Sequence, residues 1–324
     1  MKLKKLGTAV AVSAALSAGT IGQAHADAFA ESLLDVTGLI FTKGGTTPFD
    51  VSDFSQLSIL DTLTNTALLT PGGNTSQVSS TNTFQATVDA LQACVGTCTK
   101  GQNDFNPDVP PPTATFARSD TLLAGQPISG TGFTTGVRAA DISETSILGN
   151  AFGGSTGDDI LTTTFQFVLA HDVGQTDIEF NARTYLQAWT AAGTGPGTSA
   201  GADFKVEFKI VDGVGGATLL DWIPNGNIGT GTQTGLIVSA EACNLDAAAS
   251  ATFNQPSGPT ENCSGSFAAV STFALLANHP YSLTITQHTS SQAAEVVRVP
   301  EPATLALLGI GLAGLGFANR RRKA

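Results

Sequence analysis

Basic residues are scarce in the central part of this 324-residue chain. Of the 15 Lys and Arg residues, three lie within residues 1–26 and four within residues 320–323, whereas 25 of the 26 Asp and Glu residues lie within residues 27–299. Residues 27–299 therefore carry a net charge near −17. Such a surface repels nucleic acid and anionic lipid, so we expect neither as a partner. It favours solubility and contact with divalent cations in a polysaccharide matrix.

Methionine and the polar aromatic residues are also nearly absent. Met1 is the sole methionine. The chain has two Trp and two Tyr but 18 Phe, and it has 36 Gly. A composition rich in Gly, Ser, Thr and Ala favours many short strands and turns over long helices. It also offers no aromatic platform for sugar rings. About 270 central residues suffice for a large core, as one sandwich or two smaller domains.

Cysteine is limited to four residues, which fit an oxidising compartment. Cys94 and Cys98 are four positions apart, whereas Cys243 and Cys263 are twenty apart. Because short loops close easily, we predict a disulfide within each pair, one of three possible connectivities. A zinc site is the alternative, although no histidine lies near either pair and the spacings differ from those of zinc ligands.

The N-terminus has the pattern of a secretory signal peptide over residues 1–26. Lys2, Lys4 and Lys5 form a charged start, and an apolar, Ala-rich stretch follows as far as Ile21. Ala24-His25-Ala26 then forms an A-x-A cleavage site, so we predict that the mature chain begins at Asp27. The central part of the chain is therefore expected to be translocated.

The C-terminus combines a rigid break, an apolar span and a basic end. Pro300-Glu301-Pro302 is stiff, since each proline fixes φ and lacks an N–H. We predict a transmembrane helix over residues 303–319. Its uncharged residues reach roughly 24 Å, which is shorter than the membrane's hydrocarbon core of about 30 Å, but local thinning of the bilayer can compensate for the difference. Arg320, Arg321 and Arg322 should stay cytoplasmic. An ordinary single-span anchor is the alternative to a processed tail.

This order of features resembles the PEP-CTERM sorting signal, a bacterial tail that is recognised by exosortase, a membrane transpeptidase-like enzyme. The resemblance covers residues 300–324. It implies where the protein is sent and says nothing about a biochemical activity. It implies export through the inner membrane of a Gram-negative-type bacterium, where the C-terminal helix anchors the precursor. An exosortase would then process the tail, and the product would belong to the cell surface or extracellular matrix.

A second resemblance lies in two internal stretches, Phe116–Gly125 and Trp222–Gly226. They are similar to stretches of the exosortase-dependent surface proteins, which are β-rich bacterial proteins. This resemblance implies a β-rich body and supplies no active-site residue.

Alternating apolar and polar residues predict a mainly β fold, an antiparallel β-sandwich of jelly-roll or Ig-like type. Asp203–Asp212 alternates most cleanly, with Phe204, Val206, Phe208 and Ile210 on one face. Tyr281 is placed like the corner tyrosine that starts a late strand of such sandwiches. The predicted strands are Ser32–Phe41, Thr162–Ala170, Thr176–Asn181, Tyr185–Thr190, Asp203–Asp212, Gly235–Ala240, Ser266–Leu276 and Pro280–Gln287.

One short helix and one internal boundary are also predicted. Phe84, Val88, Leu91 and Val95 recur at helical spacing, which predicts a helix over Thr83–Val95. Residues 100–112 are rich in turn-forming residues and end in three prolines, which makes them the best internal boundary. The expected organisation is a signal peptide at 1–26, an N-terminal part at 27–112, a sandwich at 113–299 and the tail at 300–324.

The boundary segment contains a candidate metal site. Asp104, Asn106 and Asp108 spell D-x-N-x-D, the opening of a calcium loop. The rest of the segment departs from the calcium-loop pattern. Val109 occupies the position of the turn glycine, and Thr115 occupies that of the bidentate glutamate. A solvated loop is the alternative, and we expect no cofactor.

Other candidates for chemistry have simpler explanations. Gly153–Gly157 reads G-x-S-x-G, but a nucleophile elbow needs a helix after Ser155, and a β-patterned run follows instead. His171, His279 and His288 could converge, yet strand-end histidines are commonly solvated or hydrogen-bonded. Asp158 and Asp159 could pair for glycoside hydrolysis, but neighbours on a strand point to opposite faces.

The sequence therefore favours an exported, acidic, non-enzymatic surface protein with a structural or adhesive role in an exopolysaccharide layer. Its expected partners are an exosortase, the inner membrane before processing, and the exopolysaccharide itself. A secreted hydrolase or a carbohydrate-binding module that acts on matrix polysaccharide is the alternative. Convergence of Asp, Glu and His side chains in a cleft would distinguish an enzyme from the other two.

Overall fold

The computed structural model describes residues 27–295 apart from 71–72, 82–86, 109–112, 149–152, 193, 195, 231–232 and 257–259. The predicted signal peptide with Ala24 and Ala26 lies outside the described residues. So do the sorting residues Pro300–Pro302, the predicted transmembrane helix and the basic end. Within the described ranges, no helix is long and apolar enough to cross a membrane.

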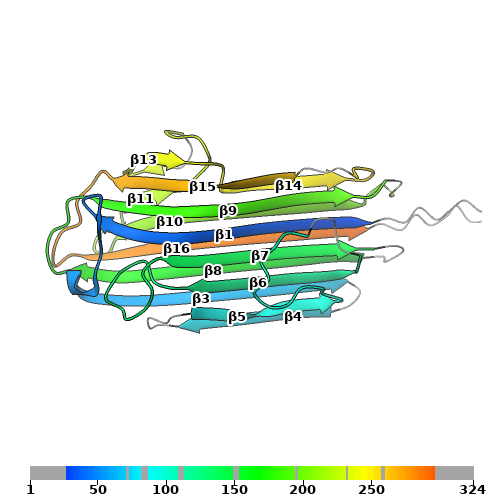
Figure 1. Ribbon diagram of the computed structural model, residues 1–324, viewed down its shortest axis with the longest axis horizontal. Helices are drawn as coiled ribbons and strands as arrows, with labels where there is room; N and C mark the ends of the chain where they lie inside the picture. The colour runs from blue at the N-terminus through cyan, green and yellow to red at the C-terminus, as the bar shows by residue number, and fades with distance from the viewer. Residues whose placement is uncertain are drawn as a thin grey trace, which may run out of the picture.

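The described chain folds as a sandwich of two antiparallel sheets, whose long strands follow the longest axis of the molecule (Figure 1). Sheet 1 has the order β13-β15-β9-β1-β7-β6-β5, with β2 paired to β1. Its strands are β1 (Ala28–Lys43), β2 (Thr47–Pro48), β5 (Thr87–Gly96), β6 (Phe116–Ala124), β7 (Val137–Ile147), β9 (Thr176–Thr190), β13 (Leu236–Glu241) and β15 (Thr260–Ser271).

Sheet 2 has the order β12-β11-β10-β16-β8-β3-β4, with β14 paired to β10. Its strands are β3 (Phe54–Thr70), β4 (Gly73–Thr81), β8 (Gly153–Leu169), β10 (Ser199–Asp212), β11 (Thr218–Trp222), β12 (Gln233–Thr234), β14 (Asp246–Thr252) and β16 (Pro280–Glu295). Each sheet combines strands from before and after residues 109–112.

The alternating pattern in the sequence correctly predicts which residues line the core. Phe204, Val206, Phe208 and Ile210 on β10 are all buried, whereas the lysines and the glutamate between them are partly exposed. The two predicted strands Thr176–Asn181 and Tyr185–Thr190 form one continuous strand, β9. The corner tyrosine is also confirmed, because the N–H of Leu276 donates to Tyr281 Oη at 2.9 Å.

The predicted helix over Thr83–Val95 is wrong, because Thr87–Gly96 forms strand β5. The register shifts between Ala90 and Ala93 where β5 pairs with β6, as expected of a β-bulge. Val88, Ala90 and Ala93 are buried, while Leu91 is 62% exposed. The extra residue breaks the two-residue period, so the apolar positions come to resemble a helical repeat.

The interior changes character along the strands. At one end the two sheets are separated by large aromatic side chains; Phe180, for example, packs on Phe208, Trp222 and Phe267 with centroid distances of 4.8–5.8 Å. At the other end, most of the buried inward positions are small or polar: Ala28, Ala30, Ser32, Ala117, Ser143, Ser155, Ala200, Ala202, Ser291 and Ala293. We call these the aromatic half and the small-residue half of the core.

The sheets approach closely in the small-residue half. A Cβ at Gly157 on β8 would lie 2.6 Å from the backbone oxygen of Arg118 and 2.5 Å from Ser143 Oγ, both in sheet 1. Ser143 Oγ also contacts Ser291 Oγ at 3.1 Å, and Ser32 Oγ donates to the carbonyl of Asp203 at 2.7 Å. Hydrogen bonds between the sheets therefore take over part of the role that apolar packing has in the aromatic half.

Candidate functional site

Buried carboxyl groups lie inside the small-residue half, next to the aromatic half. Asp61 on β3, Asp141 on β7 and Asp159 on β8 are fully buried and point between the sheets. Asp61 accepts from Thr163 at 2.7 Å, and Asp159 Oδ2 accepts from the N–H of Asp120 and from Thr289, each at 3.3 Å. The contact between Asp159 and Asp120 joins the two sheets, whereas the other two contacts lie within sheet 2.

Burial raises the pKa of each of these carboxyl groups above its ordinary value. Removal from water raises the pKa of Asp141 to about 8 and that of Asp61 to about 6. Burial also raises the pKa of Asp159 well above its ordinary value, and the charge of Asp141 adds to this effect. The pair Asp141 and Asp159 therefore carries protons near neutral pH, because two bare carboxylates in a dry site would repel each other.

A second group of charges lies on the outer face of sheet 1. It consists of Glu31, Lys100, Arg118, Asp120 and Glu144, which we call the charged cluster. All five have side chains that are 9% exposed or less. The segment of residues 97–108, between β5 and β6, covers them.

Arg118 is the centre of the charged cluster. It is fully buried, and its guanidinium donates to Glu144 Oε2, to Asp120 Oδ2 at 3.0 Å and to the carbonyl oxygens of Gly101 and Asp104. A guanidinium suits this position because it can donate in several directions in one plane. Arg118 thus fixes the covering segment to strand β6.

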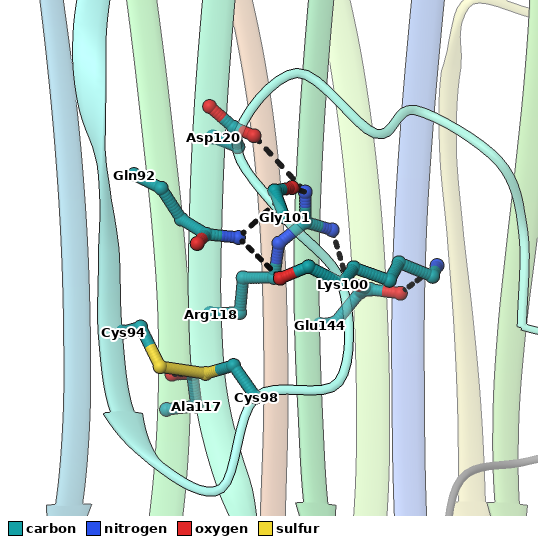
Figure 2. The surroundings of a disulfide bond; sticks show 9 residues. All are labelled: Gln92, Cys94, Cys98, Lys100, Gly101, Ala117, Arg118, Asp120 and Glu144. Atoms are coloured by element: carbon teal, nitrogen blue, oxygen red, sulfur yellow. Dashed lines mark hydrogen bonds and ion pairs between the residues drawn. A yellow bond between two sulfur atoms is a disulfide. The ribbon is translucent and has the colours of Figure 1, made fainter.

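The Cys94–Cys98 disulfide closes one end of the covering segment beside these contacts (Figure 2). The side-chain amide of Gln92 donates to the carbonyl oxygens of Lys100 and Gly101 at 3.4 Å, which adds a second fixed point. The other disulfide, Cys243–Cys263, is also present, so both predicted pairings are confirmed and no cysteine is free among the described residues.

The calcium candidate forms part of this covering segment. Asp104 Oδ1 accepts from the side-chain amide of Asn106 at 2.8 Å, and Asp108 Oδ1 lies 3.3 Å from Lys100 Nζ. Lys100 also contacts the carbonyl oxygen of Asn106. The positive charge next to this loop is therefore an ammonium group of the chain itself. No group of three metal-ligating side chains is found among the described residues.

The three histidines each lie beside different carboxylates, and His288 also lies 3.5 Å from Asp203. His171 lies 3.2 Å from Asp53, His279 lies 3.0 Å from Asp212, and His288 lies 2.7 Å from Asp158. The hydrogen bond that the His288 ring donates to Asp158 is the main reason that the pKa of His288 is raised. Asp158 and Asp159 point to opposite faces of sheet 2, as their adjacent positions predict.

Ser155 points into the sandwich and is 1% exposed. His288 lies on the neighbouring strand β16 but points to the outer face of the same sheet, where it meets Asp158. The serine therefore has neither access to a substrate nor this histidine as a base. The glycine-rich sequence around it has a packing reason, since Gly157 allows the close approach of sheet 1.

We expect no labelling of Ser155 by a fluorophosphonate probe in the folded protein, because its hydroxyl is buried and unactivated. The measurement is in-gel fluorescence, with a known serine hydrolase added to the same sample as the positive control. Labelling of the wild type that disappears in Ser155→Ala would contradict this structural assignment and support a hydrolase.

Sequence reasoning missed both the charged cluster and the buried carboxyl groups. Arg118 and Glu144 each stand among small or apolar residues within a strand, in Ala117–Ser119 and in Ser143–Thr145. A charge flanked in this way can mark a strand that is covered on both faces. The covering partner is a loop distant from Glu144 in sequence, so the pairing itself could not be read from the pattern.

Comparison with protein families gives one match. Residues 298–323 match the family model described as the PEP-CTERM protein-sorting motif. The chain has no match among curated proteins. The motif implies an exported, exosortase-processed protein with a cell-surface location. It covers the predicted sorting residues Pro300, Glu301, Pro302 and Arg320–Arg322, which are outside the described residues.

Proposed function

We propose that this chain is a structural or adhesive component of an exopolysaccharide layer. In this proposal a cleavable signal peptide exports the chain, the C-terminal helix holds the precursor in the inner membrane, and an exosortase cuts near Pro302. The folded body then reaches the surface or the matrix of a Gram-negative-type bacterium. The observation that carries the proposal is the PEP-CTERM motif at residues 298–323.

The body supports a role without catalysis. The candidate nucleophile Ser155 is buried, and the three histidines lie apart from one another, His171 beside Asp53, His279 beside Asp212 and His288 between Asp158 and Asp203. The charged cluster connects a surface segment to the sheet through contacts among its own members, which is the arrangement of a structural group. Two disulfides and long paired strands suit a protein that must persist outside the cell.

The rigid break is the part of the tail that distinguishes processing from simple anchoring. An anchor needs only an apolar span and positive residues, whereas a processing enzyme must bind extended backbone in its active site. Pro300 and Pro302 keep the backbone extended just before the span. The proposal therefore predicts that these residues determine where the protein ends up.

Replacement of Pro300, Glu301 and Pro302 by Ala should leave the full-length protein in the inner membrane of an exosortase-carrying host. The wild type should instead be found with the extracellular polysaccharide fraction. The measurement is fractionation followed by immunoblotting against the body. The matched control carries Leu305→Ile and Leu307→Ile, which alter the span but keep it apolar, and it should behave as the wild type does. Identical location of the triple variant and the wild type would refute the proposed processing.

A further inference from the structure

Lys100 and Glu144 form an amine and carboxyl pair that is almost closed off from solvent. Lys100 Nζ contacts Glu144 Oε1, and the two side chains are 9% and 1% exposed (Figure 2). The same nitrogen lies 3.4 Å from Glu31 Oε1 and 3.3 Å from Asp108 Oδ1. The covering segment, fixed by the Cys94–Cys98 disulfide and by Arg118, holds the amine in this position.

The two glutamates that contact Lys100 differ in their surroundings. Glu144 Oε2 accepts a hydrogen bond from Arg118 Nη1, which withdraws electron density from the carboxyl carbon. Glu31 has no arginine partner, and burial together with the nearby charge of Glu144 raises its pKa well above the ordinary value. Glu31 therefore holds a proton more readily than an ordinary carboxyl group and lies 3.4 Å from the amine, whereas Glu144 is a polarised carboxyl group in contact with the same amine.

We infer that Lys100 and Glu144 condense to an intramolecular amide, with Glu31 as the acid that assists departure of water. This cross-link would join the covering segment to strand β7 through a covalent bond that reducing agents cannot break. It goes beyond the sorting and the matrix role proposed above, since it concerns self-modification of the folded body.

The reaction balances without a cofactor or an external reactant. A proton first passes from the Lys100 ammonium to the Glu144 carboxylate, which leaves a neutral amine beside a neutral acid. Nζ then forms a bond to the carboxyl carbon of Glu144, and one carbon–oxygen bond breaks. The departing oxygen leaves as water with a proton from Glu31, and Glu31 recovers a proton from the nitrogen. No atom is oxidised or reduced.

Proximity and desolvation both favour this step. Groups held in contact by a folded scaffold react with effective concentrations of about 10⁵–10⁸ M, which offsets the tendency of amides to hydrolyse in bulk water. Conversion of the ion pair to an amide also removes one positive and one negative charge from a nearly dry site. Water can leave past Asp108, whose side chain is 19% exposed at the edge of the cluster.

Peptide mapping of the mature chain tests the inference. After full denaturation, reduction and digestion, we expect a linked pair of peptides that contains Lys100 and Glu144 and is lighter than the two separate peptides by one water molecule. Tandem mass spectrometry should place the bond between these residues. Separate, unmodified peptides carrying Lys100 and Glu144 would overturn the inference, as would a water loss located elsewhere.

Three variants sharpen the test. Lys100→Arg should abolish the linked peptide, because a guanidinium is a poor nucleophile and stays protonated. Glu31→Gln should lose the linked peptide while the Cys243–Cys263 disulfide and the β-sheet circular dichroism remain. Lys209→Arg is the matched control, since Lys209 lies 3.7 Å from Asp221 at a more exposed site, and this variant should keep the link. A link that persists unchanged in Glu31→Gln would contradict the role of Glu31.

Discussion

Replacement of Asp141 by asparagine should stabilise the protein at pH 7 by about 2–4 kcal/mol. Burial raises the pKa of Asp141 from 3.8 to about 8, so the folded protein holds a proton that the unfolded chain releases. The free energy of unfolding therefore falls as the pH rises from about 4 to about 8, by about 1.4 kcal/mol per pH unit for this one group. Asparagine keeps the shape of the neutral acid and has no proton to lose.

The measurement is urea unfolding at several pH values between 5 and 8. The variant and the wild type should diverge as the pH rises, and thermal unfolding at pH 7 should show an increase in Tm of about 5–10 °C for the variant. Asp61 and Asp159 remain in the variant, so some pH dependence will persist. Asp246→Asn, at an exposed position on β14, is the matched control and should change stability by less than about 0.5 kcal/mol. Parallel pH profiles of Asp141→Asn and wild type would show that Asp141 is not buried as a neutral acid.

Arg118→Met should destabilise the protein by about 3–5 kcal/mol, because it leaves buried groups without their partner. Asp120 would keep a buried carboxyl group with no cation beside it, and the carbonyl oxygens of Gly101 and Asp104 would lose their donor. The effect should appear in urea unfolding. Limited proteolysis should also show faster cleavage within residues 97–108, since Arg118 fixes this segment to β6.

Arg138→Met is the matched control for Arg118→Met. Arg138 pairs with Asp35 at 3.1 Å, but its side chain is 44% exposed, so loss of this pair should cost less than about 1 kcal/mol. The double variant Arg118→Met with Asp120→Asn should recover part of the loss, because the unpaired charge is removed. Equal losses in the free energy of unfolding for the two arginine variants would show that burial of Arg118 does not increase the cost of removing it.

The strands could be predicted from the sequence where one face is apolar and the other polar. On β10, Phe204 and Ile210 alternate with lysines, and the structure places them as expected. Asp120, Asp141 and Asp159 look like ordinary exposed strand residues, yet all three are fully buried. A two-residue period shows which side chains share a face and gives no information on what covers that face.

Two local features explain the remaining differences. The bulge in β5 shifts the apolar positions near Ala90 and Ala93, and this shift produced the false helical spacing. Gly157 looked like part of a loop or a nucleophile elbow, whereas it permits contact with the backbone of Arg118 across the sandwich. Both features depend on a partner strand, which the local sequence does not identify.

The mass of the mature protein tests the proposed processing by an exosortase most directly. The protein should be purified from two strains of one host, with and without an exosortase, and its termini determined by mass spectrometry. We expect a chain that begins at Asp27 in both strains and ends near Pro302 only where the exosortase is present. Mature protein that retains Arg320–Lys323 in the exosortase-carrying strain would contradict the proposed processing.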